Sequence, residues 1–452
     1  MREKQGDLPV VIVGAGFSGT LLAVNLLRLG ARVVLVERNR DSLARGLAYT
    51  TRQPEHLLNV RASNMSAYPD DLGHFQRWMG FSSAEQANRF VPRLTYGQYL
   101  REQLMAALAS APDRVVIKEQ EALRIETLPD RQVLHLASGE RIEARAVVLA
   151  LGHFVSAGLP VLAGLAPPVL VDNPWSAQAV EGLEGVEEVL LIGTGLTAVD
   201  VALSLDKAGY RGRITALSRR GLRPRAHALV GPVAGQVARP EARGSRLLRA
   251  VRQRAEQVGW RHAIDELRPH TQSLWRLHDT AAQARFLRHL RPWWDVHRHR
   301  LAPPVAERIA ALEAEGRLRF VGGKVLSAQM QGGKARIGWR PRGQDGVREM
   351  EAGRVIPCIG PEGDLARCDH PLLRGLLESG LVRADAHRLG LDVDHVGRLV
   401  DAAGRRQDRL LAVGPITKGE AWEIIAVPDI RRQVWDLARY LTHSHWVGGE
   451  GL

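Results

Sequence analysis

Cysteine is nearly absent from this chain of 452 residues, which contains only Cys358 and Cys368. Two cysteines ten residues apart neither build a disulfide framework nor form a CxxC pair. Enzymes that pass electrons to a disulfide need two thiols close together, so disulfide reductase chemistry is not expected. The low cysteine content is typical of a reducing compartment, and we expect a cytoplasmic protein.

A long uninterrupted apolar run is also lacking. The most apolar stretch near the N-terminus, residues 10–29, is broken by Gly14, Gly16 and Gly19. A bilayer span needs about 20 mostly apolar residues, so neither a membrane helix nor a signal peptide is predicted. With 45% hydrophobic and 25% charged residues, the composition is that of a globular chain. Its length suits roughly two or three domains.

Lysine is scarce, because only six of the 62 basic residues are lysine and the rest are arginine. The formal net charge is +13. One explanation is a general drift toward arginine over the surface, and the other is an excess directed at anionic ligands such as dinucleotides. No nucleic-acid-binding module accompanies the charge, so no nucleic-acid partner is expected.

The N-terminal segment contains a complete dinucleotide-binding pattern. An apolar run at 10–13 leads into a glycine turn, a helical pattern follows over 20–29, and a second apolar run at 32–36 ends at Glu37. Gly14 permits the tight turn, Gly16 lets the backbone approach a pyrophosphate, and Gly19 allows close packing of helix and strand. Glu37 can accept hydrogen bonds from a ribose diol. The predicted dinucleotide-binding residues of this unit are Glu37 and the turn Gly14-Ala15-Gly16-Phe17-Ser18-Gly19.

The same pattern recurs in the middle of the chain. An apolar run at 189–192 leads into a second glycine turn, a helical pattern extends to about Gly209, and an apolar strand is predicted over 213–217. We interpret this segment as a second dinucleotide fold, which binds NAD(P)H. Its predicted coenzyme-binding residues are Gly193, Gly195, Leu196, Thr197 and Ala198.

Arg219 and Arg220 follow the second strand of this unit, in the place that Glu37 occupies in the first unit. A carboxylate repels a 2′-phosphate, whereas each guanidinium contact to it is worth about 1.5–3 kcal/mol. The two arginines therefore favour NADPH, with NADH as the weaker coenzyme. The alternative is that they are solvated surface groups in an arginine-rich chain.

Three alternating stretches, at 122–126, 132–136 and 141–149, predict short antiparallel strands between the two units. The last of them ends in the small-residue turn Ala150-Leu151-Gly152, where the chain can pass close to a cofactor. Residues 241–315 are predicted to be helical and are rich in basic residues, tryptophan and histidine.

Strands resume near Leu318, Ala335 and Arg354, and the last strand, 410–413, meets Gly414. A helix is predicted from about Trp422 to Leu441. The fold class is therefore α/β, with two Rossmann-like dinucleotide-binding domains. The predicted FAD-binding domain comprises 1–172 and 356–452, and the predicted NAD(P)-binding domain comprises 173–355 with a helical insertion at about 241–315.

These motifs together resemble a bacterial family of FAD/NAD(P)-binding flavoproteins with two dinucleotide-binding domains, and the resemblance covers nearly the whole chain. The resemblance implies that the first unit binds FAD and that the protein uses NAD(P)H. It does not determine the substrate. FAD-dependent urate hydroxylases resemble the same group, so heteroaromatic hydroxylation is a candidate reaction. Besides the two glycine turns, the resemblance rests on Gly46-Leu47-Ala48-Tyr49, His56-Leu57-Leu58-Asn59-Val60, Asn64-Met65-Ser66, Arg291 to Arg300, and Gly414 to Pro428. Asn59, Gly152, Gly414, Pro415 and Ile416 are accordingly expected beside the FAD.

The chain departs from many two-domain flavoproteins at the C-terminal flavin strand. Those proteins have Gly-Asp there, and the acid binds the ribityl chain, whereas this sequence has Gly414-Pro415. The ribityl contact must therefore come from other residues. Residues 416–419 precede a helix whose N-terminus can stabilise a reduced anionic flavin.

The richest chemical cluster outside the turns is the segment 293–300. If it were extended, His297 and His299 would share a face, but no cysteine or carboxylate pattern completes a metal site, and no metal is expected. In one interpretation, Trp294, Asp295, His297 and Arg298 line a substrate or nicotinamide pocket. In the other, the segment is a packing and salt-bridge element that joins the helical insertion to the nucleotide domain.

The favoured function is an NADPH-dependent FAD monooxygenase that uses molecular oxygen to hydroxylate a small polar substrate, such as an amine or a heteroaromatic compound. One alternative is a flavin reductase or oxidase that inserts no oxygen. Another is a non-catalytic redox sensor that keeps the nucleotides as structural ligands. Oxygen incorporation separates the first from the second, and absence of NADPH-driven flavin bleaching would favour the third. The oligomeric state is left open.

Overall fold

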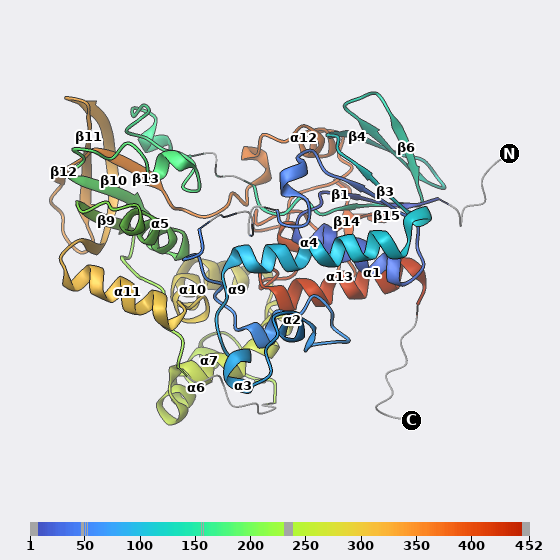
Figure 1. Cartoon of the computed structure of the whole chain (residues 1–452), viewed down its shortest axis with the longest axis horizontal. Helices are drawn as coiled ribbons and strands as arrows, with labels where there is room; N and C mark the ends of the chain where they lie inside the picture. Colours follow the sequence, from blue (N-terminus) through green and yellow to red (C-terminus); the bar gives the residue numbers. More distant parts are fainter. Residues whose placement is uncertain are drawn as a thin grey trace.

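Two six-stranded sheets form the frame of the molecule. The computed structural model describes residues 8–46, 49, 51, 53–154, 156, 158–229 and 238–444, so Leu47 and Ala48 of the motif at Gly46 lie outside the described residues. The first sheet has the strand order β14-β15-β7-β1-β2-β3, and the second has the order β12-β11-β10-β9-β8-β13. The first sheet lies on the right of Figure 1 and the second on the left. The predicted α/β fold with two Rossmann-like units is confirmed.

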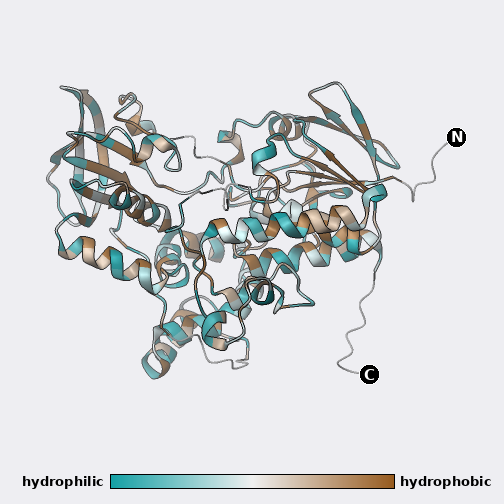
Figure 2. Cartoon of the chain, viewed as in Figure 1, coloured by the Kyte–Doolittle hydropathy of each residue, from teal (hydrophilic) through white to brown (hydrophobic). Residues whose placement is uncertain are grey.

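The centre of the first sheet is parallel and fully buried. Strand β1 pairs in parallel with β2 and β7, and β7 pairs in parallel with β15. Continuous β-branched runs suit strands that are covered on both faces, and Figure 2 shows these strands mostly in brown. The strands are β1 (Val10–Val13), β2 (Val33–Val36), β3 (Val115–Lys118), β7 (Ala146–Leu149), β14 (Arg398–Val400) and β15 (Arg406–Ala412). Helices α1 (Phe17–Arg28), α4 (Arg93–Ser110) and α13 (Val427–Thr442) share one core with this sheet.

The second sheet repeats the arrangement in its parallel half. Strands β8, β9, β10 and β13 are parallel neighbours, and β11 and β12 extend the sheet in antiparallel fashion. The strands are β8 (Glu188–Ile192), β9 (Arg213–Ser218), β10 (Leu318–Gln331), β11 (Lys334–Pro341), β12 (Arg348–Ala352) and β13 (Arg354–Pro357). Helices α5 (Leu196–Lys207) and α11 (Pro303–Ala314) share a core with it.

Two predicted elements differ from the structure. The predicted strand 141–149 is wrong as one element, because the chain leaves the three-stranded sheet β4-β5-β6 at Arg145 and enters the first sheet. The burial pattern changes there from alternating to continuous, as expected when a strand becomes covered on both faces. The last helix begins at Val427 rather than near Trp422, with Pro428 in its first turn. The separate sheet comprises β4 (Ala122–Thr127), β5 (Gln132–Leu136) and β6 (Arg141–Ala144).

The insertion between β9 and β10 is helical, as predicted. A bridge between Ala226 and Leu301 closes its base. In Figure 1 its helices lie below and between the two sheets. They are α6 (Gly244–Val258), α7 (Trp260–Leu267), α8 (Thr271–Arg276), α9 (Thr280–Arg285) and α10 (Arg291–Arg298), with a π-helical turn, η8 (Phe286–Leu290). The remaining α-helices of the described chain are α2 (His74–Trp78), α3 (Ala84–Ala87) and α12 (Pro371–Glu378).

Although the insertion belongs to the second unit in sequence, it docks on the C-terminal part of the first. Trp275 stacks on Trp422 with ring centroids 5.0 Å apart, and its indole N–H donates to the Gly419 carbonyl at 2.8 Å. Arg276 pairs with Glu420 at 2.8 Å. The insertion therefore ties the second sheet to the segment that follows β15.

The two units also contact each other directly. Arg93, in the first turn of α4, pairs with the buried Asp200 of α5 at 2.9 Å. The Nε2 atom of His56 and the hydroxyl of Ser204 are 2.8 Å apart. Buried ion pairs keep their geometry because separating one charge from its partner is costly. These contacts fix the position of α5 relative to the first sheet.

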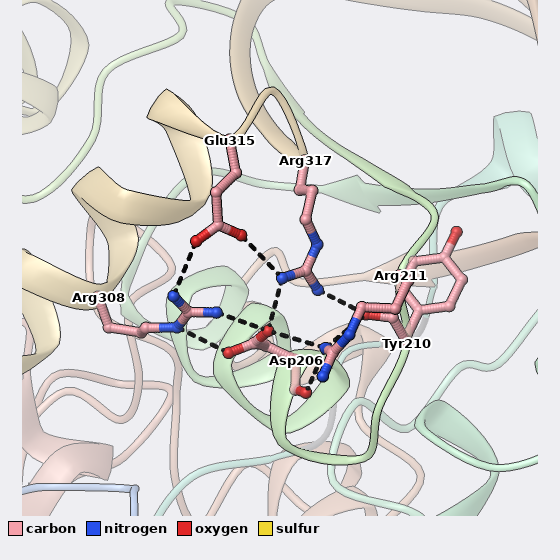
Figure 3. Close-up of polar contacts among 6 residues, drawn as sticks. All are labelled: Asp206, Tyr210, Arg211, Arg308, Glu315 and Arg317. Carbon is pink, nitrogen blue, oxygen red and sulfur yellow. Dashed lines mark hydrogen bonds and ion pairs between the residues drawn. The ribbon is translucent and has the colours of Figure 1, made fainter.

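Asp206, near the end of α5, binds three arginines (Figure 3). Arg308 of α11 donates to both carboxylate oxygens at 2.8 Å, and Arg317 donates to Oδ1 at 2.8 Å. Glu315 bridges the same two arginines at 3.0 Å. The hydrogen bond from Arg308 is the main cause that lowers the pKa of Asp206. The cluster joins α5, α11 and the start of β10.

We expect Asp206→Asn to lower the free energy of unfolding by about 1–2 kcal/mol, since water partly screens the cluster. The folded pKa lies below the unfolded value of about 4, so this stabilisation is complete above that value and disappears as the pH falls through the folded pKa. The gap in Tm between the parent and the variant should therefore shrink in acid. Thermal melting at several pH values measures it, with the exposed Asp345→Asn as control. An equal gap at all pH values would contradict the role of the Asp206 charge.

Candidate functional site

Three turns meet at the carboxyl edge of the first sheet. The Ala150 N–H donates to the Val13 carbonyl at 2.8 Å, and the Val413 N–H donates to the Leu149 carbonyl at 3.0 Å. The ends of β1, β7 and β15 are thus adjacent. The turns 14–19, 150–152 and 414–417, recognised separately in the sequence, lie together at the edge where ligands bind in open parallel sheets.

The first glycine turn has the geometry that its sequence predicts. Gly14 has φ +99°, and a Cβ there would lie 2.5 Å from the Ala150 carbonyl oxygen. A Cβ on Gly19 would lie 1.9 Å from the Gly14 carbonyl oxygen. At Gly16 the nearest atom would be the Gly46 Cα, at 3.3 Å. The glycines therefore keep the turn tight against the sheet and, at Gly16, close to the backbone of Gly46.

The N-terminus of α1 offers backbone amides without a partner side chain. Among the described residues no side chain caps this helix, and no acid stands in its first turn. Glu37 lies beside the turn, where its carboxylate accepts hydrogen bonds from the N–H groups of Ala15 at 2.8 Å and Asn39 at 3.1 Å. Phe17 and Ser18 have buried side chains, so only their backbone faces a ligand. Free amides and a neighbouring carboxylate fit the diphosphate and ribose of FAD.

The C-terminal turn is held by a residue that sequence reasoning missed. Gln433 of α13 accepts a hydrogen bond from the Gly414 N–H at 2.7 Å and donates to the Thr417 hydroxyl at 2.9 Å. Gly414 has φ +78°, and a Cβ there would lie 2.3 Å from the Ser18 hydroxyl. The turn, η10 (Gly414–Thr417), is therefore packed against the start of α1. Pro415 is half-buried within it.

Two basic side chains that were not singled out from the sequence flank these turns. His153 is exposed, and the positive charge of the nearby Lys418 lowers the pKa of its imidazole. Burial lowers the pKa of Lys418, whose ammonium lies 4.8 Å from the Trp422 ring centre. Each comes directly after a predicted turn, which is the signal that could have identified them. The site thus has positive charge beside η10.

Of the remaining predicted FAD residues, Gly152 has φ +68° and no described atom within 4 Å of a built Cβ. Ile416 is buried, and its carbonyl accepts a hydrogen bond from the Leu391 N–H at 2.8 Å. The Asn59 carbonyl accepts a hydrogen bond from Nε2 of His227 at 3.0 Å. The structure therefore places the Asn59 backbone at the contact between the two units.

The second glycine turn is open toward solvent. Gly193 has φ +133°, and a Cβ there would lie 2.2 Å from the Cys358 carbonyl oxygen. A Cβ on Gly195 would have no described atom within 4 Å. Helix α5 begins at Leu196, and Thr197 is its second residue. Among the described residues, no side chain caps this helix and no acid stands in its first turn. This helix N-terminus also fits a phosphate, while the buried Ala198 packs into the core.

The two arginines after β9 have different surroundings. Arg219 is exposed. Arg220 donates to the carbonyls of Arg288 at 3.3 Å and His289 at 3.4 Å, both in η8 of the insertion. Arg220 therefore also holds the insertion, whereas Arg219 is the more accessible cation.

The segment 293–300 is largely helical, in agreement with the helical prediction for 241–315, so His297 and His299 do not share the face of an extended strand. Helix α10 places Trp294 and Arg298 on the same buried carboxylate, Glu423. The Trp294 indole N–H donates to Oε1 of Glu423 at 2.8 Å, and the Arg298 guanidinium pairs with Oε2 at 3.1 Å. Although burial alone would raise it, the charges of Arg298 and His299 lower the pKa of Glu423. Glu423 lies in the segment Gly414 to Pro428, but the sequence did not identify it as the partner of Trp294 and Arg298.

The other two candidate catalytic residues, Asp295 and His297, have partners other than Glu423. Asp295 pairs with Arg291 at 3.5 Å and is 41% exposed. The Nδ1–H of His297 donates to the Trp293 carbonyl at 2.7 Å, and the His297 ring lies 4.9 Å from that of Trp260. In the described part of the chain no group of histidine, cysteine, aspartate and glutamate side chains could hold a metal ion.

Neither cysteine has the surroundings of a redox thiol. Both are free and buried. Burial raises the pKa of the Cys358 thiol well above its usual value and that of Cys368 to about 11. A thiolate is the reactive form, so these raised pKa values disfavour it in both side chains.

None of the helices in the described ranges is long and apolar enough to span a bilayer. No curated protein matches the sequence. The family model described as FAD-NAD(P)-binding matches residues 11–154, which include the first glycine turn and the turn at Ala150 to Gly152.

Several solved structures share the fold over almost their full length. The ornithine N-hydroxylase of Kutzneria sp. 744 has a TM-score of 0.63 at 15% identity, covering 96% of this chain and 99% of that chain. The L-lysine 6-monooxygenase of Pseudomonas syringae has a TM-score of 0.63 at 14% identity, covering 97% and 99%. The bacillithiol disulfide reductase of Staphylococcus aureus has a TM-score of 0.58 at 12% identity, covering 97% and 99%. The chain therefore has the fold of two-domain flavoproteins, and its residues 11–154 match the FAD-NAD(P)-binding family.

Proposed function

We propose that the chain is an NADPH-dependent FAD monooxygenase that hydroxylates a small polar substrate, such as an amine or a heteroaromatic compound. The observation that carries the proposal is a pair of uncapped glycine-turn helices in a chain without a reactive dithiol. The similar structures include enzymes named for amine hydroxylation and for disulfide reduction. Of these two activities, the buried cysteines with raised pKa values favour hydroxylation over disulfide reduction.

The residues of the first unit suit FAD. The α1 amides would bind the diphosphate and Glu37 the ribose, while Lys418 brings positive charge to the η10 turn. When bound, FAD would supply the redox chemistry between the nicotinamide coenzyme and molecular oxygen. The insertion, held on the segment 418–429, would keep water away from the reacting groups.

The test is anaerobic mixing of the purified, FAD-loaded protein with NADPH, with and without candidate amines and purines, while flavin absorbance is followed. We expect NADPH to bleach the flavin and isotopically labelled oxygen to appear in the product after air is admitted. Bleaching with hydrogen peroxide as the only oxygen product would identify an oxidase. Absence of bleaching would contradict an enzyme of this class.

NADPH is expected to be preferred because Arg219 lies exposed after β9. Arg219→Ala should raise KM for NADPH about ten- to a hundredfold and leave KM for NADH nearly unchanged. Arg220→Ala should give the same selective change together with a lower Tm, since Arg220 also binds η8. Steady-state kinetics with both coenzymes measure these effects. An equal loss for both coenzymes would show that the arginines act through folding or general electrostatics.

A further inference from the structure

A small, partly open pocket lies where three parts of the chain meet. Arg61 comes from the first unit, His227 from the segment after β9, and Arg261 and Asp265 from α7 of the insertion. Arg300, just after α10, completes the wall. The pocket has a volume of about 20 Å³, enough for one water molecule or one small polar group.

Positive charge in this pocket exceeds negative charge. Three arginines line it, and Asp265 is the one carboxylate among its described lining residues. Asp265 pairs with Arg300 at 3.0 Å, which leaves the charges of Arg61 and Arg261 without a carboxylate partner in the lining. Arg61 and Arg300 are 7% and 3% exposed. Burial of a guanidinium without full charge compensation is unfavourable, and an anion would relieve it.

The hydrogen bonds inside the pocket leave donors free for a ligand. Arg61 donates to the Asn88 and Ala228 carbonyls at 2.8 and 2.6 Å. Arg261 donates through Nε to the Ala226 carbonyl at 3.0 Å, and within the described structure its two terminal nitrogens form no hydrogen bond. Carbonyl groups orient these guanidiniums but carry no formal charge. These hydrogen bonds hold the two guanidinium groups in fixed orientations.

The neighbouring groups agree with an uncompensated positive potential. Burial lowers the pKa of Arg61 and of Arg300. The pKa of His227 falls to about 4, first through burial and further through the charges of Arg300 and Arg61. His227 is therefore neutral at pH 7, and a bound anion would raise its pKa.

We propose that this partly open pocket receives one oxygen atom of an oxyanion group, a carboxylate or a phosphate, of a small-molecule ligand, with the rest of the group at its mouth. This assignment rests on the proposed function. The anionic group would belong to the substrate or the coenzyme of that enzyme, and it would bind where the two nucleotide units and the insertion meet. Two guanidiniums without a carboxylate partner favour an oxyanion over a neutral group.

The test is titration of the FAD-loaded full chain with sodium acetate and with inorganic phosphate at constant ionic strength. Tryptophan fluorescence reports binding, because the guanidiniums of Arg261 and Arg300 lie 4.5 and 5.0 Å from the Trp260 ring centre. We expect saturable binding that Arg261→Gln weakens about tenfold and Arg261→Lys weakens less. Arg249→Gln, on the exposed face of α6, removes the same charge outside the pocket and should bind like the parent.

A second variant changes binding in the opposite direction. Asp265→Asn removes the competing carboxylate, while its amide oxygen can still accept the hydrogen bond from Arg300. We expect tighter acetate and phosphate binding in this variant, with a Tm close to that of the parent. Loss of binding in Arg261→Gln through misfolding would not produce this gain.

The source of the anionic group follows from a competition with NADP⁺. Displacement of phosphate by NADP⁺ would assign the pocket to the coenzyme, and simultaneous binding would assign it to the substrate; both support an oxyanion site. No saturable binding, or equal affinity in the parent and Arg261→Gln, would overturn it. These titrations need no flavin reduction, so their failure is distinct from failure of NADPH-driven oxygen incorporation.

Discussion

FAD is expected to be lost from the protein when Gly16 is replaced by leucine. A side chain at this position would fill the approach to the α1 amides, next to Gly46, and would leave the φ of the turn unchanged. Loss of two phosphate contacts costs about 3–6 kcal/mol, which is about a hundredfold or more in affinity. Flavin absorbance per protein after gel filtration measures the effect.

The matched control is Gly375→Leu in α12, where a built Cβ meets no described atom within 4 Å. It adds the same side chain away from the turn and should keep its FAD. Far-ultraviolet circular dichroism shows whether both variants remain folded. A folded Gly16→Leu protein that retains a full complement of FAD would contradict the assignment of this turn to the cofactor.

Arg298→Ala is expected to destabilise the protein by about 3–5 kcal/mol, because it strands a buried carboxylate. The Arg298 side chain is 11% exposed and that of Glu423 is 3% exposed, so water cannot replace the lost charge. The structure thus favours the packing interpretation of this segment for Arg298. Thermal melting, flavin occupancy and hydrogen peroxide yield should be measured on the same sample.

Adding Glu423→Gln to Arg298→Ala should recover part of the lost stability, since the stranded charge is removed. Arg291→Ala is the matched control, because Arg291 is 41% exposed and pairs with an exposed carboxylate. A stable, flavin-loaded Arg298→Ala protein that releases hydrogen peroxide instead of product would contradict the packing role. That outcome would place Arg298 at the substrate.

Both nucleotide units were predictable because each is encoded locally. In the first unit, apolar strand, glycine turn, helix and acid all fall between Val10 and Glu37. The helix boundary was less accurate, since α1 begins at Phe17, inside the glycine turn, rather than at Thr20. Apolar periodicity begins only after the turn, whereas the backbone becomes helical as soon as Gly16 permits it.

The contacts of the site were less predictable because they join residues far apart in the chain. Gln433 holds the turn at Gly414, and Glu423 binds Trp294 and Arg298 from another unit. No local pattern marks a glutamine or a glutamate for such a role. The segment 293–300 combined aromatic, basic and imidazole groups, but its composition could not show which carboxylate it would meet.

The docking of the insertion on the first unit affects how cooperatively the protein unfolds. Two domains that are connected only by linker segments unfold as separate units, whereas a large shared interface makes their unfolding cooperative. Here Trp275 and Arg276 hold the insertion on the first unit, and Arg93 holds α5 from the other side. Removing either sheet would expose the apolar and charged groups that the other now covers. The chain should therefore behave as a single foldon, in which neither nucleotide-binding unit is stable after the other has unfolded.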